Sequence, residues 1–463
     1  MFAAALLVGG LIALAVYGVD QNNRAQSAMA RAEVDSAVLA ENAIPDFDGY
    51  TLTVLCDAKG SDAFALPREN ETAISRAVVA LDRHLAAETG VTVRATVAAD
   101  FLAAAREDLL SGDGSYELYA ASAKDGLAPL LTSGGLAALS EDSRLSLGGG
   151  YNLAVMDALA LYGKTYLISS AALGGCDGVY CVAFNRKIEE ELLTLYPDGQ
   201  RLTAAALDGT LTFEQLAVAA RAAKETHLAE QETAAVAEID AVEMQENFCG
   251  LALDRRSVFP LAFGMGGGFV LVGRSGTAIA EYDDLCGVLA PVGQLLDDGT
   301  ATLVGDVFGE GGSLYGVTKL GDMQKYKATL GDVGLLPMPK NTAAEPYRCY
   351  LDLEATPLFA LPAGADVLRT TYLIDRAVFL ARGYIEPLWR RGVTGENDED
   401  DAVLTLIEKS IGSDLSGLFG YGDIPSLYAS LAEAGGTPAL HLDYYNRKTL
   451  YEKALSIIEK RLN

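Results

Sequence analysis

Basic residues, histidine and tryptophan are scarce in this sequence, and each shortage excludes a kind of partner or site. The 463 residues contain 35 Lys and Arg against 63 Asp and Glu, which gives a formal net charge of -28. A chain with this charge repels polyanions, and it has no cluster of Lys or Arg that could neutralise phosphates. The sequence therefore predicts no nucleic-acid partner. Half of the residues are hydrophobic and 21% are charged, which is typical of a globular protein.

Metal-binding patterns are also missing. The three histidines, at positions 84, 227 and 441, form no HExxH motif, and the six cysteines form no CxxC pair. The acidic run 396–401 lacks the glycine and the glutamate of an EF-hand loop. We therefore expect no metal. Cys176 and Cys181 flank a short loop and could form a disulfide in an oxidising compartment, whereas buried free thiols are the alternative.

The sequence contains only partial matches to known catalytic and cofactor-binding motifs. A Gly-Lys-Thr sequence at 163–165 has the end of a phosphate-binding loop, but the glycine required five residues earlier is Ala158. The glycine-rich run 264–268 is followed by Phe269, where a dinucleotide-binding fingerprint needs glycine. There is no GxSxG nucleophile elbow. The sequence thus predicts no cofactor, no catalytic residue and no enzyme; an extracytoplasmic enzyme would need two carboxylates meeting in a cleft.

The N-terminus carries a long apolar run. Residues 2–19 contain no charge, and at about 1.5 Å per residue they nearly cross a bilayer core of about 30 Å. We expect residues 1–19 to be a signal or a membrane-anchor helix, with a buried core helix as the alternative. The polar, Ala-rich residues 20–45 are expected to be a linker. The protein is therefore predicted to be extracytoplasmic, either tethered to the cell surface or secreted.

After the linker, short apolar runs alternate with helical patterns. Residues 50–56, 91–97 and 116–121 predict strands, and residues 71–88 predict a helix with one apolar face. This alternation is typical of βαβ units and a largely parallel sheet. Ligands of open α/β sheets lie beyond the carboxyl ends of the strands. The loops after the first and third strands are therefore the first places to expect a site.

Several short motifs, taken in order, resemble those of one family. The first strand and its exit loop, 53–60, are followed by a helix and the segment 88–93. Further matching segments lie at 111–119, 133–139, 162–166, 182–187, 208–216 and 334–340. The chain resembles the extracellular solute-binding proteins of carbohydrate ABC importers, the family that includes maltose-type binding proteins. The likeness spans most of residues 46–463, and the stretch GLLPMPK at 334–340 is its most specific part.

The resemblance implies an α/β fold, a two-lobed periplasmic-binding-protein-like clamp of type II with mixed, mostly parallel sheets, preceded by the N-terminal hydrophobic helix. Lobe one would comprise residues 46–168 and 345–385, and lobe two residues 170–340 and 386–463. Hinges would fall near Ser169 and Lys340. A ligand would lie in the cleft between the lobes, and closure of the lobes would complete its contacts.

The resemblance also implies ligand-contact positions in that cleft. Asp57 and Lys59 follow the first strand, and Ser122 and Lys124 follow the third. Ordinary solvated loop residues are the alternative for these four. Trp389 is the only tryptophan, and its ring is either a platform for a sugar or a packing residue between lobes or in the core. The remaining cleft candidates are Glu310, Tyr347 and Tyr350.

The sequence as a whole predicts a monomeric, bacterial solute-binding subunit of an ABC importer. It would capture a small polar solute, with carbohydrate favoured, and deliver it to the membrane subunits of the permease without turnover. The alternative is a membrane-tethered extracellular sensor or surface protein that has the same fold and no transport role.

Overall fold

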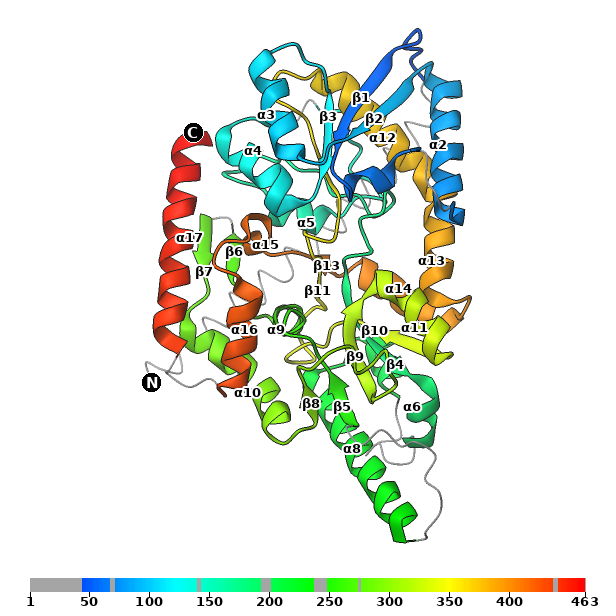
Figure 1. The fold of residues 1–463 in the computed structure, drawn as a ribbon, viewed down its shortest axis with the longest axis vertical. Coiled ribbons are helices and arrows are strands. Elements are labelled where there is room, and N and C mark those ends of the chain that lie inside the picture. The colour runs from blue at the N-terminus through cyan, green and yellow to red at the C-terminus, as the bar shows by residue number, and fades with distance from the viewer. Residues whose placement is uncertain are drawn as a thin grey trace.

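A computed structural model describes residues 44–66, 71–139, 143–192, 201–236, 248–273, 276–435 and 440–462. The expected signal or anchor helix at residues 1–19 lies outside the described residues, as does nearly all of the linker. The described chain is a mixed α/β structure with one sheet in its upper part and a second sheet in its lower part, as oriented in Figure 1.

The upper sheet has four strands in the order β12-β3-β1-β2. These strands are β1 (Thr51–Cys56), β2 (Thr92–Val97), β3 (Leu118–Ala121) and β12 (Leu358–Ala360). β1 pairs in parallel with both β2 and β3, whereas β12 runs antiparallel to β3. The sequence TLTVLC suits β1, because β-branched residues favour an extended backbone and its last three residues are buried. The parallel pairing brings the exit loops of β1 and β3 to one edge of the sheet.

Helices α2 (Ala73–Thr89), α3 (Phe101–Ser111) and α12 (Val367–Tyr384) pack around the upper sheet (Figure 1). Local signals set the bounds of α2. It begins at a capping box between Thr72 and Ser75, and it ends at Gly90, whose φ of 71° is the left-handed conformation that favours glycine. The buried face of α2 packs on α12, so a segment that follows β12, far from α2 in the sequence, helps to complete the core of the upper part.

The lower sheet has five strands in the order β10-β4-β9-β5-β8. They are β4 (Tyr180–Asn185), β5 (Cys249–Ala252), β8 (Ala301–Thr302), β9 (Ser313–Lys319) and β10 (Val333–Leu336). β5 is parallel to β8 and β9, whereas β4 is antiparallel to β9 and β10. A separate hairpin joins β6 (Val270–Gly273) to β7 (Gly276–Ile279). Both main sheets are therefore mixed.

Of the other helices, α4 (Ala128–Ser133) lies beside α3 in the upper part, and most of the rest lie around the lower sheet or along the side of the molecule (Figure 1). The rest are α5 (Leu153–Ala158), α6 (Arg186–Leu192), α7 (Leu202–Leu207), α8 (Phe213–Val236), α9 (Val258–Gly264), α10 (Tyr282–Asp297), α11 (Met323–Leu330), α13 (Glu386–Thr394), α14 (Asp398–Glu408), α15 (Leu415–Phe419), α16 (Ile424–Glu433) and α17 (His441–Leu462).

The acidic run at 396–401 forms the start of α14. The side chain of Asn397 caps this helix by accepting from the backbone N–H groups of Glu399 and Asp400. The buried guanidinium of Arg186 then binds the carboxylate of Asp400, and Lys327 Nζ lies 3.3 Å from Asp400 Oδ2. These charges tie α14 to the lower sheet and serve the fold.

The chain crosses between the two parts several times. The segment before β4 leaves the upper part, the segment after β10 returns to it, and the chain passes downward again between α12 and α13 (Figure 1). A short parallel ladder of β11 (Cys349–Tyr350) and β13 (Ile411–Gly412) lies in the middle of the molecule. The bridges Ile168–Phe359 and Val179–Leu351 pair two of the crossing segments.

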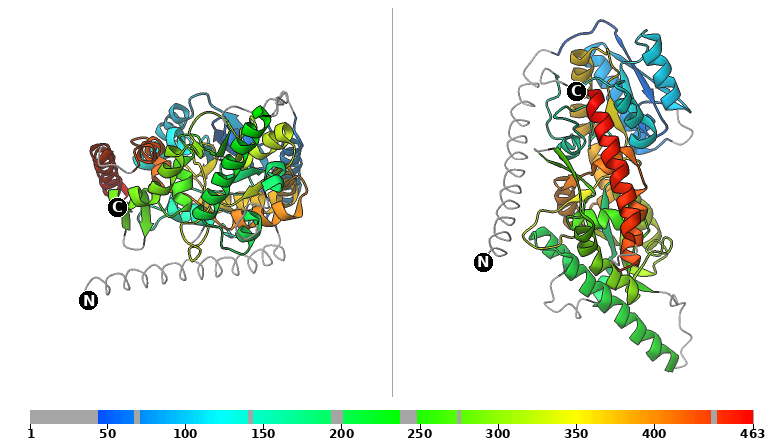
Figure 2. Two further views of the ribbon diagram at one scale, coloured as in Figure 1. Left: turned by 90° about the horizontal axis from the view of Figure 1, so that it is seen from below. Right: turned by 90° about the vertical axis from the view of Figure 1, so that its left-hand side faces the viewer.

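Helix α17 also connects the two parts, along one side of the molecule (Figures 1 and 2). In its first half, Tyr444 Oη donates to the carbonyl of Ala280 and Tyr451 Oη donates to Ser416, both in the lower part. Near its end, Tyr162 Oη donates to the carbonyl of Leu455 at 2.9 Å, and Arg461 donates to Thr132 at 3.0 Å. Both of these partners of α17 belong to the upper part.

All six cysteines lie among the described residues, and they are free. Cys176 and Cys181 are buried, and burial raises the pKa of both thiols. The structure therefore has the buried free thiols that the sequence left as one of two possibilities.

Candidate functional site

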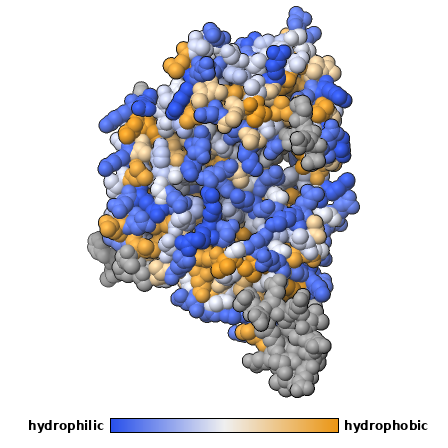
Figure 3. All heavy atoms as spheres, in the orientation of Figure 1, coloured by the Kyte–Doolittle hydropathy of each residue, from blue (hydrophilic) through white to orange (hydrophobic). Residues whose placement is uncertain are grey.

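One cavity lies between the upper and lower parts, and a second, smaller cavity adjoins it within the lower part. The larger has a volume of about 440 Å³ and the smaller about 330 Å³, and Tyr180 and Arg256 line both. These volumes lie within the range of small-molecule sites in proteins. Figure 3 shows that hydrophilic residues gather across the middle of the molecule on the face it displays, between the two parts.

The walls of the larger cavity come from both parts of the chain. Lys124, in the loop after β3, is contributed by the upper part. The segment after β11 contributes Asp352 and Glu354, and the lower part contributes the start of α9 and the region of α15 and α16. The smaller cavity lies at the carboxyl ends of β5, β8 and β9, the edge at which open α/β sheets hold ligands.

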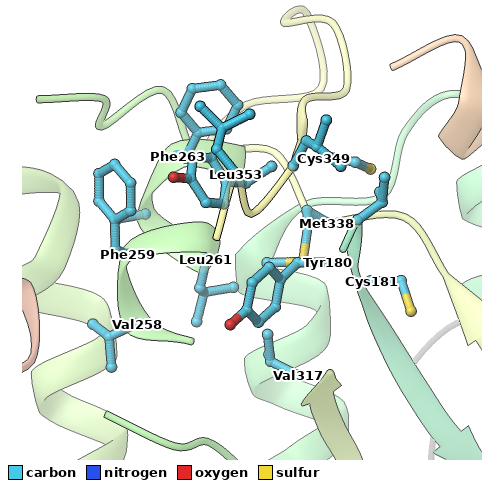
Figure 4. Packing of buried hydrophobic residues seen from close by; sticks show 14 of the residues in the cluster. Tyr180, Cys181, Val258, Phe259, Leu261, Phe263, Val317, Met338, Cys349 and Leu353 are labelled. Carbon is cyan, nitrogen blue, oxygen red and sulfur yellow. The ribbon is translucent and has the colours of Figure 1, made fainter. Parts of the chain in front are cut away.

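Aromatic rings form the base of the larger cavity. The ring centroid of Tyr350 lies 6.3 Å from that of Tyr180 and 5.1 Å from that of Phe259. Figure 4 shows Tyr180, from β4, beside Val317, with Phe259 and Phe263 of α9 nearby. Tyr180 and Tyr350 are 4% and 6% exposed, yet neither hydroxyl hydrogen-bonds another residue of the described chain. Both rings line the cavity, which is where these two hydroxyls can find a partner.

Charged side chains on the cavity walls pair with one another. Glu354 accepts from Arg256 at 2.5 Å, and its other oxygen lies 3.6 Å from Lys124 Nζ. Glu354 therefore links the upper part, through Lys124, to the lower part, through Arg256. Lys319 Nζ lies 2.7 Å from Asp352 Oδ2 and 5.3 Å from the ring centroid of Tyr180. Ligand hydroxyls entering the cavities would meet donors and acceptors that these pairs already hold in place.

The predicted contact residue Asp57 organises the two exit loops. One carboxylate oxygen accepts from Gly60 N at 2.7 Å, and the other accepts from both N and Oγ of Ser122 at 2.8 Å. Glycine is needed at position 60, because a Cβ there would lie 1.9 Å from the carbonyl oxygen of Ala120. Asp57 and Ser122 thus join the loops that follow β1 and β3, and neither residue lines the two cavities.

The remaining predicted contacts are distributed unevenly. Lys124 and Tyr350 line the larger cavity. Lys59 and Glu310 are exposed and line neither cavity. The hydroxyl of Tyr347 is used inside the lower part, where it accepts from Leu211 N at 3.0 Å and donates to the carbonyl of a residue in α7. A ligand role for these residues stays a prediction.

Trp389 is half-buried and packs against the hydrophobic core of the lower part. Its indole Nε1 donates to Asp177 Oδ1 at 2.6 Å, so α13 is tied to the segment that enters β4. Burial raises the pKa of Asp177, while the hydrogen bond from Trp389 opposes that rise. Trp389 does not line either cavity, and these contacts favour the packing role that the sequence left open.

Sequence reasoning missed most of the residues that line the cavities. Tyr180, Arg256 and Glu354 carry no local signal, since each is a single residue in a segment of ordinary composition. The one weak signal of a site is that Tyr180 carries a hydroxyl at the start of an apolar strand. These three residues can be identified as cavity-lining residues only from the folded structure, which brings them together from distant parts of the chain.

Two negative findings apply to the part of the chain that the structure describes. No group of three or more His, Cys, Asp and Glu residues there is arranged to hold a metal ion. In the same residues, none of the helices combines the length and the apolar character needed to cross a membrane.

The fold defines a class: mixed α/β sheets in two parts with a cavity between them, as in two-lobed binding proteins. Solved structures that share this fold include the GacH receptor of Streptomyces glaucescens, solved unliganded and with acarbose (TM-score 0.52, 14% identity, 88% of this chain and 99% of that chain). An ABC substrate-binding protein from Listeria monocytogenes in complex with cycloalternan also matches (TM-score 0.50, 12% identity, 90% of this chain and 99% of that chain). A sugar transporter from Rhizobium etli, solved in an open conformation, is a third match (TM-score 0.55, 13% identity, 88% of this chain and 99% of that chain).

These identities are low, and the likeness is one of fold. No protein-family model matches the sequence, and neither does any curated protein. The coverage of nearly the whole of each neighbouring chain means that the similarity extends over both parts of the molecule.

Proposed function

We propose that the chain is the solute-binding subunit of an ABC importer and that it captures a carbohydrate between two lobes. In this proposal, lobe one comprises residues 46–168 and 345–385, and lobe two comprises residues 170–340 and 386–463. Hinges near Ser169 and Lys340 allow a type II clamp to close on its ligand. The protein works outside the cytoplasm, and residues 1–19 export or anchor it. Its protein partners are the membrane subunits of the permease.

One observation carries this proposal: the unpartnered hydroxyls of Tyr180 and Tyr350 line the cavity between the two parts. A saccharide offers hydroxyl groups that both donate and accept, and C–H faces that pack on aromatic rings. The paired charges of Glu354, Arg256 and Lys319 supply further fixed donors and acceptors. Fold neighbours solved with acarbose and with cycloalternan support the same ligand class.

The proposed action is binding without turnover. The fold neighbours named above are described as a receptor, a substrate-binding protein and a transporter. Closure of the lobes would bring Lys124 and the loops after β1 and β3 onto a ligand that rests on Tyr180 and Tyr350. Release would follow when the lobes reopen at the permease.

The test is a binding titration of the full-length chain, purified in a detergent that has no sugar headgroup. Acarbose, cycloalternan and maltotetraose are titrated by calorimetry and by the fluorescence of the only tryptophan, Trp389. We expect saturable binding of at least one saccharide. Tyr180→Phe and Tyr350→Phe should each weaken it roughly two- to tenfold, because each removes one hydrogen bond to the ligand.

The matched control is Tyr445→Phe, since Tyr445 lies on α17 and is 44% exposed. Its affinity should equal that of the unaltered chain. A folded protein that binds none of the saccharides would contradict the proposal, as would equal affinities for the Tyr180 and Tyr350 variants and the control.

A further inference from the structure

The walls of the two cavities carry more negative than positive charge. Six carboxylates and three cations line them. All three cations already have a partner on the walls: Lys124 and Arg256 pair with Glu354, and Lys319 pairs with Asp352. None of them is left to compensate the other wall carboxylates.

The uncompensated carboxylates cluster at the smaller cavity. Asp306 is neutralised by Lys325, whose Nζ lies 2.7 Å from Asp306 Oδ2. Asp254 and Asp322 line the same cavity, and neither has a cation within 4.0 Å among the described residues. A third such carboxylate, Asp423, lines the larger cavity.

Both Asp254 and Asp322 keep free acceptor capacity. Asp254 Oδ1 accepts from the backbone N–H groups of Arg256 and Ser257, which leaves Oδ2 without a partner in the described chain. Asp322 accepts only one long hydrogen bond, from Thr318 Oγ1 at 3.4 Å. Each carboxylate can therefore bind a strong donor without losing an existing contact of the fold.

The hydroxyl of a largely buried tyrosine independently marks this place as a ligand site. Tyr180 is 4% exposed, it lines both cavities, and its hydroxyl has no hydrogen-bond partner among the described residues. Burial raises the pKa of Tyr180, with the charges of Asp352, Asp254 and Asp322 adding to the rise, so these carboxylates lie near the phenol. The Tyr180 hydroxyl therefore keeps its capacity to donate and accept a hydrogen bond for a group that enters the cavities.

We infer that the smaller cavity binds a positively charged amine of the saccharide, with the ammonium lying among Asp322, Asp254 and the Tyr180 hydroxyl. This inference rests on the proposed carbohydrate-binding function. An ammonium donates three hydrogen bonds and cancels charge, and hydrogen bonds between charged groups are shorter and stronger than neutral ones. A sugar hydroxyl in the same place donates one hydrogen bond and leaves both carboxylates uncompensated.

The experiment compares saccharides with a free, charged amine with saccharides whose amine is acetylated and neutral or is absent. Glucosamine oligosaccharides and their N-acetylated counterparts of equal length are titrated into the full-length chain at pH 7, together with neutral maltotetraose. We expect the amine-bearing oligosaccharide to bind at least tenfold more tightly than the acetylated one. Asp322→Asn should reduce this ratio to about threefold or less, and added salt should reduce it in the unaltered chain.

The matched control is Asp113→Asn, an exposed carboxylate on the loop after α3. It should leave the ratio unchanged, which separates a local contact from the general negative charge of the chain. Asp423→Asn tests whether the larger cavity contributes instead. Melting temperatures of all variants confirm that each is folded.

The outcomes distinguish the two proposals. Equal or tighter binding of neutral saccharides overturns the amine site and leaves the carbohydrate-binding function intact. A ratio that is the same in Asp322→Asn as in the unaltered chain also overturns the amine site. Failure to bind any saccharide, charged or neutral, overturns both proposals.

Discussion

At the scale of single residues, the surroundings of a side chain decide its role. The sequence predicts both Asp57 and Tyr350 as ligand contacts. In the structure, the carboxylate of Asp57 is occupied by Gly60 and Ser122, whereas the hydroxyl of Tyr350 faces a cavity without a partner. Asp57 therefore holds the loops that a ligand would meet, while Tyr350 is free to meet it.

Replacing Asp57 with alanine should lower both stability and ligand affinity. The change removes three hydrogen bonds to a carboxylate, so we expect the free energy of unfolding to fall by roughly 2–4 kcal/mol. Denaturant unfolding followed by circular dichroism measures this loss. Asp113→Ala is the control and should change stability by less than about 0.5 kcal/mol. Equal stabilities of the two variants would show that the loop junction contributes nothing.

Glu189, on α6, should make stability depend on pH. It is 1% exposed, its Oε1 has no hydrogen-bond partner, and burial raises its pKa from 4.5 to about 7. Between these values the folded chain holds a proton that the unfolded chain releases. The free energy of unfolding should therefore fall as pH rises from about 4.5 to 7, by roughly 3 kcal/mol from this group alone.

The measurement is denaturant unfolding at several pH values for the unaltered chain and for Glu189→Gln. The variant should lose this part of the pH dependence and should be the more stable protein above pH 7. Glu190→Gln, at the neighbouring exposed position, serves as the control. The same pH dependence in all three proteins would rule out the role of Glu189.

At the scale of elements, two helices hold distant parts of the chain together. α14 is fixed to the lower sheet through the buried pair of Arg186 and Asp400. α17 begins on the lower part and ends on the upper part, where Tyr162 and Arg461 make its last hydrogen bonds. A relative movement of the two parts must carry the end of α17 along or break these contacts.

The double variant Tyr162→Phe, Arg461→Ala should free the end of α17. Two hydrogen bonds are lost, so we expect the free energy of unfolding to fall by about 1–3 kcal/mol. The amide hydrogens of the last turns of α17 should exchange several times faster, because local opening needs less free energy. Hydrogen exchange measured by mass spectrometry tests this, with Lys460→Ala as the control. Unchanged exchange in the double variant would mean that other contacts of α17 hold its end.

At the scale of the whole molecule, the larger cavity lies between two parts that several chain segments connect. This arrangement suits hinge closure, in which a ligand stabilises the state that contacts it from both sides. The pair Arg256–Glu354 joins a residue of proposed lobe two to a residue of proposed lobe one, so it is a contact that such a movement would alter.

Saturation with a bound saccharide should make the molecule more compact. Small-angle X-ray scattering should give a smaller radius of gyration with ligand than without it. The Tyr180→Phe, Tyr350→Phe double variant should need more ligand for this change. A ligand-saturated protein with unaltered scattering would mean that binding does not close the lobes.

Much of the fold follows from local patterns in the sequence. Neighbouring residues in the sequence predict three features of the fold: the alternation of strands and helices near the start of the chain, the end of α2 at Gly90, and the buried strand β4. Of the predicted site, Lys124 and Tyr350 do line a cavity, because their positions after a central strand and on a crossing segment bring them between the two parts.

The sequence by itself determined the α/β class, the acidic surface and the absence of cofactor motifs, since each depends on composition or on residues close together in the chain. Only the tertiary structure decided which side chains meet at the cavities. Tyr180, Arg256 and Glu354 come from three distant segments, and nothing near any of them marks a site. The physical reason is that a ligand site depends on hydrogen-bond capacity left unused after folding. Which groups keep that capacity, as Tyr180 does and Asp57 does not, is settled by the contacts that the folded chain makes.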